Sequence, residues 1–148
     1  MARIERIEVE VLTGDEPEAG TDALVYLGLG GREFLLDRRG EDDFRRGRRD
    51  FFVLGRGGTV ARPGMNDPRT PPLATGDLDR YPVYVRLDAR GEEDTWLLDN
   101  VWVTAETERA GIRYGRPALD GMGEERAVWL GVRAGSVLHL EELRPVER

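Results

Sequence analysis

The sequence predicts an all-β fold, an antiparallel β-sandwich of about eight strands. Apolar and polar residues alternate over several short segments, as at Ile7, Val9 and Val11, which is the period of a strand with one buried face. Glycine, proline and acidic residues separate these segments and predict turns. No segment keeps a helical period for more than about two turns. Short strands divided by turns are typical of a sandwich.

The expected strands follow one another in chain order. They cover residues 7–11, 25–29, 34–36, 51–54, 81–87 and 96–103, with shorter strands near 112, 128 and 138. A tight turn at Gly30-Gly31 joins the second strand to the third. Pro82 places the start of the fifth strand at an edge or at the beginning of the strand, because proline has no amide hydrogen to donate.

The sixth strand changes its phase halfway along. Trp96 and Leu98 share one alternation, whereas Val101 and Val103 share the other. A β-bulge at residues 99–100 would restore the register, because one extra residue moves all following side chains to the opposite face. We therefore expect a bulge there, with Trp96 in the core.

Residues 55–80 form one long irregular loop. These 26 residues contain four prolines and five glycines but little apolar alternation. A loop of this length inside a compact domain is usually functional or poorly ordered. A covering or partner-binding loop and a plain ordered insertion are equally compatible with the sequence.

Composition describes an acidic chain of ordinary domain size. With 148 residues, 39% apolar residues and a net charge of −7, we expect a single soluble domain spanning 1–148. No apolar run approaches the roughly 20 residues that span a bilayer, and no signal-peptide core is visible, so we expect a cytoplasmic location. Without cysteine, disulfides and thiolate zinc sites are excluded.

Few residues suit catalysis. The chain has one serine, Ser136, one histidine, His139, and no lysine. These two residues lie on one expected strand with their side chains on opposite faces, which does not suit a Ser-His-Asp triad. His139 alternates with Leu138 and Leu140, which indicates a surface position. Carboxylates are plentiful enough for a glycosidase, but their number alone does not indicate one. We expect no enzyme activity.

Acidic residues concentrate in three connections that we expect at one end of the sandwich. If successive strands run up and down, residues 13–22, 37–48 and 88–95 share that end, with 12 of the 29 acidic residues. Such a cluster is destabilised by like-charge repulsion, which calcium relieves by binding about 6–8 oxygen atoms. The alternative is a solvated rim that nearby arginines neutralise in part. These arginines are Arg38, Arg39, Arg45, Arg46 and Arg48.

Several motifs in a fixed order extend this prediction. They are Thr13-Gly14, Gly20-Thr21-Asp22, Tyr26, Leu36-Asp37, Asp43-Phe44 with Arg46-Gly47, and Trp96 with Leu98, Val101 and Val103. This order resembles the PLAT (lipoxygenase-homology) domain, a β-sandwich found in lipoxygenases, polycystins and clostridial alpha-toxin. The 55–80 loop is longer than the usual connection of that family, so the resemblance does not cover it.

The resemblance implies two neighbouring calcium positions. The first would use oxygen atoms of Glu18, Gly20, Asp94 and Thr95. The second would use Thr21, Asp22, Asp37, Asp42 and Asp43. Ala23 stands where several relatives carry a second aspartate, and Arg45 stands where lipoxygenases carry a glutamate. Both departures weaken the second position more than the first.

The segment FRRGRRDFF, residues 44–52, also follows the pattern of the family. We expect Arg46 and Asp50 to form a structural ion pair at the start of the strand. A nucleic-acid surface is not indicated, because the chain is acidic, with an isoelectric point of about 4.9, and has no long basic stripe with interleaved aromatic residues.

In this family such domains dock onto membranes or onto partner proteins. Membrane-docking relatives carry aromatic residues at the loop tips beside calcium. The three tips here, DEPEA, RRGED and ARGEED, contain none, and Trp129 fits an exposed or a core position equally. We therefore expect a non-catalytic calcium-binding module that mediates protein–protein interaction. The alternative is a calcium-dependent peripheral membrane or lipid-binding module, with weak, salt-sensitive contact.

Overall fold

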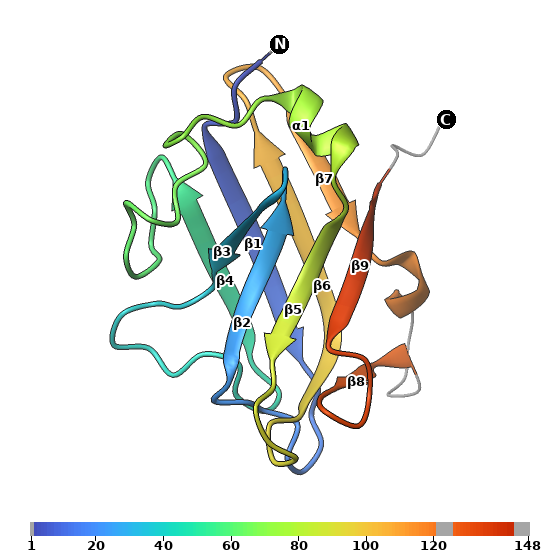
Figure 1. The fold of residues 1–148 in the computed structure, drawn as a ribbon. Coiled ribbons are helices and arrows are strands. Elements are labelled where there is room, and N and C mark those ends of the chain that lie inside the picture. The colour runs from blue at the N-terminus through green and yellow to red at the C-terminus, as the bar shows by residue number, and fades with distance from the viewer. Residues whose placement is uncertain (1, 121–125, 144–148) are drawn as a thin grey trace.

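A computed structural model describes residues 2–120 and 126–143, which fold into nine antiparallel strands (Figure 1). The predicted all-β class is confirmed. The strands are β1 (Arg6–Thr13), β2 (Leu24–Leu29), β3 (Arg32–Leu35), β4 (Arg49–Gly55), β5 (Val83–Asp88), β6 (Trp96–Glu106), β7 (Gly111–Gly115), β8 (Val128–Leu130) and β9 (Val137–Glu142). The helical elements among these residues are short, α1 (Thr75–Arg80) and the 3-10 turn η1 (Pro117–Leu119).

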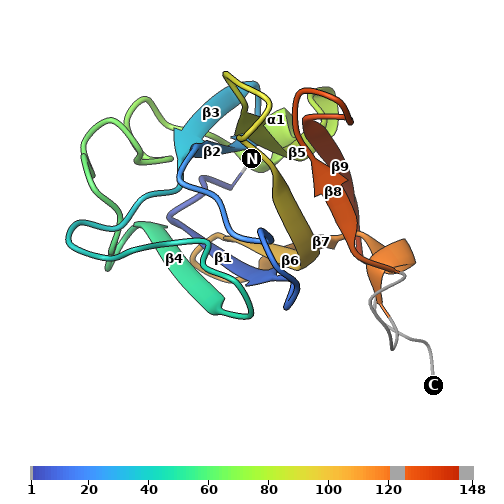
Figure 2. The same cartoon turned by 90° about the horizontal axis from the view of Figure 1, so that it is seen from below.

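The strands form two layers that are joined along one side. One layer has the order β4-β1-β6-β7, with β8 beside the first residues of β6, and the other has the order β3-β2-β5-β9. Strand β9 pairs with both β5 and β7 and so connects the layers. Figure 2 shows this arrangement from below, with β3 and β4 on the open side. The result is one curled sheet that closes on one side only.

The core lies between the layers because each long strand buries every second side chain. In β1, Ile7, Val9 and Val11 are buried while Glu8 and Glu10 are not. Val25 and Leu27 of β2 face them from the other layer in the same buried cluster. Burial of apolar surface contributes about 25 cal/mol per Å², so this alternation is the main sequence-encoded source of stability.

The phase change in β6 is a β-bulge, as predicted. Leu12 of β1 pairs with Asn100 and the next residue, Thr13, pairs with Leu98, so that Asp99 has no partner in β1. Because of this extra residue, Trp96 and Val103 both point into the core. The indole Nε1 of Trp96 donates a hydrogen bond of 3.0 Å to Thr13 Oγ1, which satisfies the only polar atom of the buried ring.

Two boundaries differ from the sequence prediction. The fifth strand begins at Val83 instead of Tyr81, because Tyr81 ends helix α1 and remains exposed over Gly31. Helix α1 itself lies inside the long segment that we expected to be irregular. Six residues are too few for a periodic apolar pattern, and only Leu78 is buried, so periodicity gave no sign of it.

The long loop covers the open side of the sandwich. Residues 58–66 run between the free edges of β3 and β4 and bond to both. The Thr59 amide and hydroxyl bond to the backbone of Val53 in β4, and the amide of Leu35 in β3 donates to Asn66 Oδ1 at 2.8 Å. An uncovered strand edge is a site for unwanted pairing. This part of the loop is therefore an ordered cover.

Side chains hold this loop in one conformation. Asn66 is buried, and its Nδ2 donates to the carbonyl oxygens of Ala61 and Arg62. Arg32 of β3 donates to the carbonyl oxygens of three residues further along, 67, 70 and 71. Backbone groups inside a long loop need such partners when water cannot reach them. Met65, at the tip, is 72% exposed.

No helix among the described residues is long and apolar enough to cross a membrane.

Replacing Trp96 with alanine should lower the free energy of unfolding by about 3–5 kcal/mol, because Trp96 is fully buried between the layers. Trp96→Phe keeps a ring in the core but leaves Thr13 Oγ1 without its donor, so its loss should be smaller, about 1–3 kcal/mol. Denaturant titration measures both free energies of unfolding. It should be followed by far-ultraviolet circular dichroism, which does not rely on tryptophan fluorescence. Equal stability of wild type and Trp96→Ala would show that this side chain is not in the core.

Replacing Asn66 with alanine should lower the free energy of unfolding by about 1–3 kcal/mol, because one buried amide and two carbonyl groups lose their partner. The neighbouring change Met65→Ser, at an exposed side chain, should stay within about 0.5 kcal/mol of wild type. Thermal melts of the two variants compare them directly. Similar melts for both would mean that the loop is not held by Asn66.

Candidate functional site

Three acidic connections lie at the same end of the molecule, as the alternation of strand direction predicted. They join β1 to β2, β3 to β4 and β5 to β6, and all three are at the lower end in Figure 1. Hydrogen bonds between them fix their relative positions. Gly47 N donates to Gly14 O, and Thr21 N donates to Phe44 O. Leu97 N, at the start of β6, donates to Ala19 O.

Phe44 is the centre of this end. Its backbone is left-handed, with φ of 61°, a conformation that is strained for a bulky residue. Its ring packs against the rings of Phe52 and Trp96, with centroids 5.4 and 5.1 Å apart. Its carbonyl oxygen lies where a Cβ on Gly20 would be 2.8 Å away. A side chain at position 20 would therefore displace the β1–β2 connection from the β3–β4 connection.

A buried carboxylate holds Phe44 in place. Asp50 is 0% exposed, and its Oδ2 accepts a hydrogen bond from Phe44 N at 3.0 Å. Its Oδ1 pairs with the guanidinium of Arg38 at 2.7 Å. Arg38 also pairs with Asp43 at 2.7 Å and lies over the ring of Phe52. Burial of the Asp50 carboxylate is compensated, because both of its oxygen atoms are bonded.

The expected ion pair between Arg46 and Asp50 is wrong. Arg46 points outward and pairs with Asp15 at 2.9 Å, whereas Asp50 points inward to Arg38. The left-handed turn at Phe44 brings Arg38, twelve residues before Asp50, closer to the carboxylate than its sequence neighbour. The short sequence separation between Arg46 and Asp50 therefore predicted the wrong partner for Asp50.

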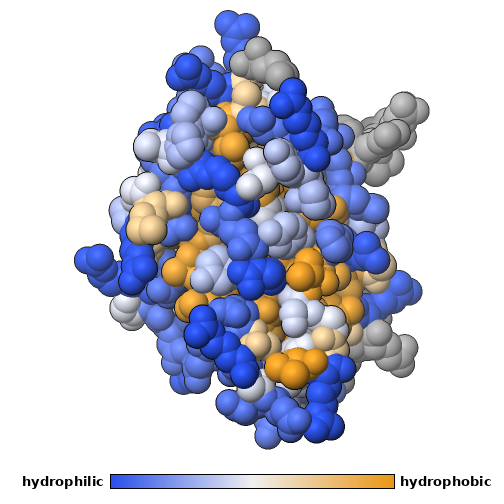
Figure 3. Space-filling model, viewed as in Figure 1, coloured by the Kyte–Doolittle hydropathy of each residue, from blue (hydrophilic) through white to orange (hydrophobic). Residues whose placement is uncertain are grey.

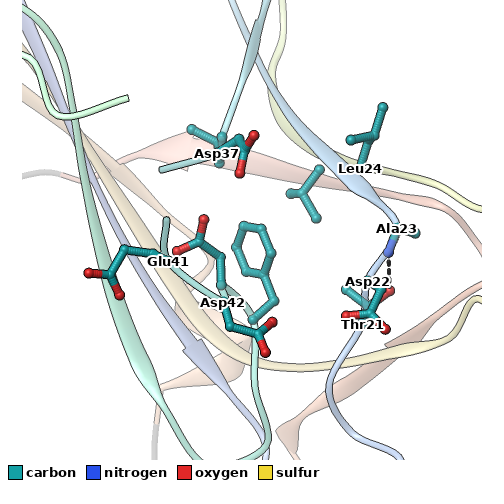
Figure 4. Close-up of a pocket in the computed structure, with 11 residues that line it drawn as sticks. Thr21, Asp22, Ala23, Leu24, Asp37, Glu41 and Asp42 are labelled. Atoms are coloured by element: carbon teal, nitrogen blue, oxygen red, sulfur yellow. Dashed lines mark hydrogen bonds between the residues drawn. The ribbon is translucent and has the colours of Figure 1, made fainter. Parts of the chain in front are cut away.

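The first cleft, here called cleft A, lies between the β1–β2 and β3–β4 connections and has a volume of about 290 Å³. It contains the whole of the second implied calcium set, Thr21, Asp22, Asp37, Asp42 and Asp43. Figure 4 shows Asp22 on one side of the hollow and Asp37 and Asp42 on the other, with Glu41 at the outer rim. Leu24 also lines it. Sequence reasoning counted Glu41 among the acidic residues of this connection but assigned it to neither calcium set.

The second cleft, cleft B, has a volume of about 600 Å³ and lies between the β1–β2 and β5–β6 connections, and Arg45 and Arg46 of the β3–β4 connection also line it. It brings together Glu18, Gly20 and Asp94 of the first implied set, together with Glu93. Thr95 does not line it, because the Thr95 amide turns back to Glu93 O at 2.9 Å. Thr21 and Asp22 line both clefts, so the two sets are neighbours, as the resemblance implied.

Several of these oxygen atoms already have cationic or backbone partners. Asp43 accepts hydrogen bonds from Nε and the backbone amide of Arg38, at 2.8 and 2.9 Å. Arg45 pairs with Asp42 at 3.0 Å. Asp94 accepts from the amides of residues 90 and 91. The remaining carboxylates of the implied sets, those of Glu18, Asp22 and Asp37, have no hydrogen-bond or ion-pair partner among the described residues.

The donor set fits calcium in its chemistry. Both clefts offer carboxylate, hydroxyl and carbonyl oxygen, and neither is lined by nitrogen or sulfur ligands from histidine or cysteine, which is what hard cations prefer. Within residues 2–120 and 126–143, however, no three acidic or histidine side chains converge closely enough to hold a metal ion. The loops would have to draw together around a cation.

A fourth loop lies at this end, and sequence reasoning did not find it. The turn between β8 and β9, residues 131–136, contacts the β5–β6 connection, because a Cβ on Gly131 would be 3.3 Å from Asp94 O. Arg133 pairs with Glu92 at 2.6 Å, and Leu87 N donates to Ser136 O. Val132 on this turn is 53% exposed.

Exposed apolar side chains therefore flank the acidic clefts. Trp129, in β8 beside Leu97 of β6, is 42% exposed, which settles its position on the surface. Leu24 and Val137 are also exposed, on neighbouring positions of β2, β5 and β9. Figure 3 shows apolar surface at the lower end of the β2–β5–β9 face, over the β8–β9 turn.

Solved structures share this fold. An alpha toxin from Clostridium absonum superimposes with a TM-score of 0.57 and 20% identity over 95% of this chain. A coral 8R-lipoxygenase, whose structure is described as showing calcium activation via a C2-like domain, superimposes with a TM-score of 0.58 and 19% identity over 93% of this chain. No protein-family model matches the sequence, and no curated protein does.

These matches confirm the predicted PLAT-like β-sandwich. The superposition covers only 32% of the toxin chain and 17% of the lipoxygenase chain. The chain thus has the fold of one part of these larger proteins. Because the sequence identity is low, the similarity shows the fold alone.

Asp50→Asn should lower the free energy of unfolding by about 3–5 kcal/mol, because it removes the buried carboxylate of an ion pair. Arg38 then keeps only Asp43 as a charged partner. Asp15→Asn is the matched control, since it removes the partner of an exposed arginine and should cost less than about 1 kcal/mol. Chemical denaturation measures both. Equal losses would contradict the role of Asp50 as the anchor of this end.

Proposed function

We propose that this chain is a non-catalytic, calcium-dependent lipid-binding module that docks on a membrane surface through its acidic end. The observation that supports this most is the position of Trp129 and Val132. Both are exposed. Val132 follows Gly131, which lies against the Asp94–Thr95 backbone of the β5–β6 connection, and Trp129 pairs with Leu97 near the start of β6. Sequence reasoning found only polar loop tips at this end. This favours the membrane alternative over the protein–protein reading that the sequence suggested.

Calcium would be held by oxygen atoms from two or three connections at once. In cleft B these are Glu18, Gly20 and Asp94, and Thr95 belongs to the implied set without lining the cleft. In cleft A they are Thr21, Asp22, Asp37, Asp42 and Asp43. Bound calcium supplies positive charge that offsets like-charge repulsion and a coordination site for phosphate oxygen. Asp42 and Asp43 would first have to leave Arg45 and Arg38.

The apolar side chains supply the second part of docking. Tryptophan is enriched at membrane interfaces, because its ring is apolar and its N–H is polar. Val132 lies at the tip of a short turn, and such a residue can enter the boundary between headgroups and acyl chains. Gly131 touches the Asp94–Thr95 backbone. The apolar turn and the β5–β6 connection would therefore be in direct contact if the connection moved around a cation.

The absence of catalysis is part of the proposal. Ser136 donates its hydroxyl to Gly131 O, whereas the ring of His139 lies beside Tyr84, with centroids 6.2 Å apart. Both are engaged in different contacts on the surface of β9 and its turn. This arrangement suits structural roles.

A protein partner is the second candidate, and one surface favours it. On the outer face of the β4–β1–β6 layer, Phe51 and Trp102 both lie beside Glu10, and Phe51 is exposed. Arg49 crosses this face to pair with Glu10 at 2.7 Å. Aromatic and arginine side chains together are enriched at protein interfaces. None of these residues lines either cleft, so a partner here would not require calcium.

Calcium should stabilise the folded chain. At a concentration 100-fold above its dissociation constant, a ligand of the folded state adds about 2.7 kcal/mol, which raises the melting temperature of a domain this size by about 5–10 °C. Thermal melts with calcium and with chelator measure the shift. Asp22→Asn and Asp94→Asn should each reduce it, whereas Glu108→Gln, at the opposite end, should not. Identical melts in millimolar calcium would contradict calcium binding.

Vesicle binding should depend on the β8–β9 turn. Val132→Asp places a charge where an apolar contact is proposed, so it should weaken calcium-dependent co-sedimentation with phospholipid vesicles by tenfold or more. Met65→Asp is the matched control, because it changes another exposed apolar residue, on the 55–80 loop. Circular dichroism verifies that both variants are folded. Equal vesicle binding by both variants would show that the β8–β9 turn does not contribute to membrane binding.

A further inference from the structure

The acidic end keeps a negative charge even when calcium is bound. The four loops that form it, residues 14–22, 36–48, 88–95 and 131–136, contain twelve acidic and seven basic side chains, a net charge of −5. Two calcium ions leave −1, and a single ion leaves −3. The surface that faces the membrane in the proposed function thus never becomes cationic.

Its arginines are also engaged. Five of the seven pair with carboxylates of the same end: Arg38 with Asp43, Arg45 with Asp42, Arg46 with Asp15, Arg90 with Asp88, and Arg133 with Glu92. An arginine that is paired in this way projects little positive potential. Attraction to anionic lipids normally requires several free basic residues near the surface. Without calcium, only Arg39 and Arg48 of this end lack an ion pair among the described residues, and when calcium binds the net charge of the end stays negative.

The apolar contact, in contrast, does not depend on the charge of the lipid. Trp129, Val132, Leu24 and Val137 are all exposed around this end. Insertion of such side chains into the headgroup region gains apolar burial on any phospholipid bilayer. The remaining electrostatic contribution then decides between lipid classes.

From these charges and contacts we infer that the acidic end selects zwitterionic phospholipid surfaces and binds anionic ones less tightly. This inference rests on the proposed function, which it makes more specific by naming the lipid. At the potential of an anionic leaflet, about −30 mV, each unit of negative charge on the protein weakens binding by about threefold. With two calcium ions bound, the expected difference between the two surfaces is therefore about threefold.

The experiment compares two vesicle compositions in saturating calcium at about 0.15 M salt. One is phosphatidylcholine alone, and the other contains enough phosphatidylserine to give a surface potential of about −30 mV. The full chain should co-sediment with both, about threefold more weakly with the anionic vesicles, and the difference should shrink as salt increases. With chelator, binding to both should fall.

A charge variant tests the physical cause. Glu16→Arg combined with Ala134→Arg adds three positive charges to the acidic end at residues that line neither cleft. Its charge with two calcium ions becomes +2, so the preference should reverse, with about tenfold tighter binding to anionic vesicles. Glu108→Arg with Ala110→Arg adds the same charge in the β6–β7 turn at the opposite end, beyond the screening length of about 8 Å, and should keep the wild-type preference.

Two results would be decisive against these conclusions, in different ways. Tighter calcium-dependent binding of wild type to anionic vesicles would overturn the headgroup inference and leave the proposed lipid-binding function intact. Failure to bind either vesicle in calcium, with both variants folded, would remove the proposed function and this inference together. An unchanged preference in the Glu16→Arg, Ala134→Arg variant would show that net charge does not set the selectivity.

Discussion

The left-handed backbone of Phe44 is the constraint on which the acidic end depends. A bulky residue in this conformation costs about 1–3 kcal/mol, and it persists because three kinds of contact hold it. Asp50 binds its amide, Thr21 binds its carbonyl oxygen, and its ring lies between two buried aromatic rings. The positions of the loops at Phe44 and Gly20 are therefore set by buried anchors of the protein, while the carboxylates that line the clefts would still have to draw together around a cation.

The arginines explain how twelve carboxylates share one end of a stable fold. Exposed pairs such as Arg45 with Asp42 each contribute less than about 1 kcal/mol, but together they reduce the repulsion that would otherwise separate the loops. Arg38 contributes more, because it binds Asp43 and the buried Asp50 at once. The same pairs compete with any cation for Asp42 and Asp43. Cleft B keeps the unpaired Glu18, but Arg45 and Arg46 also line it, so cationic side chains lie close to the carboxylates of both clefts.

Most of the fold was predictable because it follows from local alternation. The strands around Val9, Leu27 and Val85, the bulge at Asp99 and the shared end of three acidic connections all follow from a period of two and from strand direction. Contacts between distant segments were not predictable in this way. The partner of Asp50 depends on the left-handed backbone at Phe44, which the residue types in this segment do not predict. The exposure of Trp129 depends on which strand β8 joins, since AVWLG suits a core strand equally well.

Strand β1 is central in its layer, and this position has a consequence for how the chain reaches its native state. It lies between β4 and β6, and Ile7 pairs with Ala105, 98 residues later in the sequence. Contacts of such long range make folding slow, because a large loop has to close before they form. At a synthesis rate of about 5–20 residues per second, β1 leaves the ribosome about 5–20 seconds before β6 exists. During that time one edge of an apolar strand stays open to pairing with other chains.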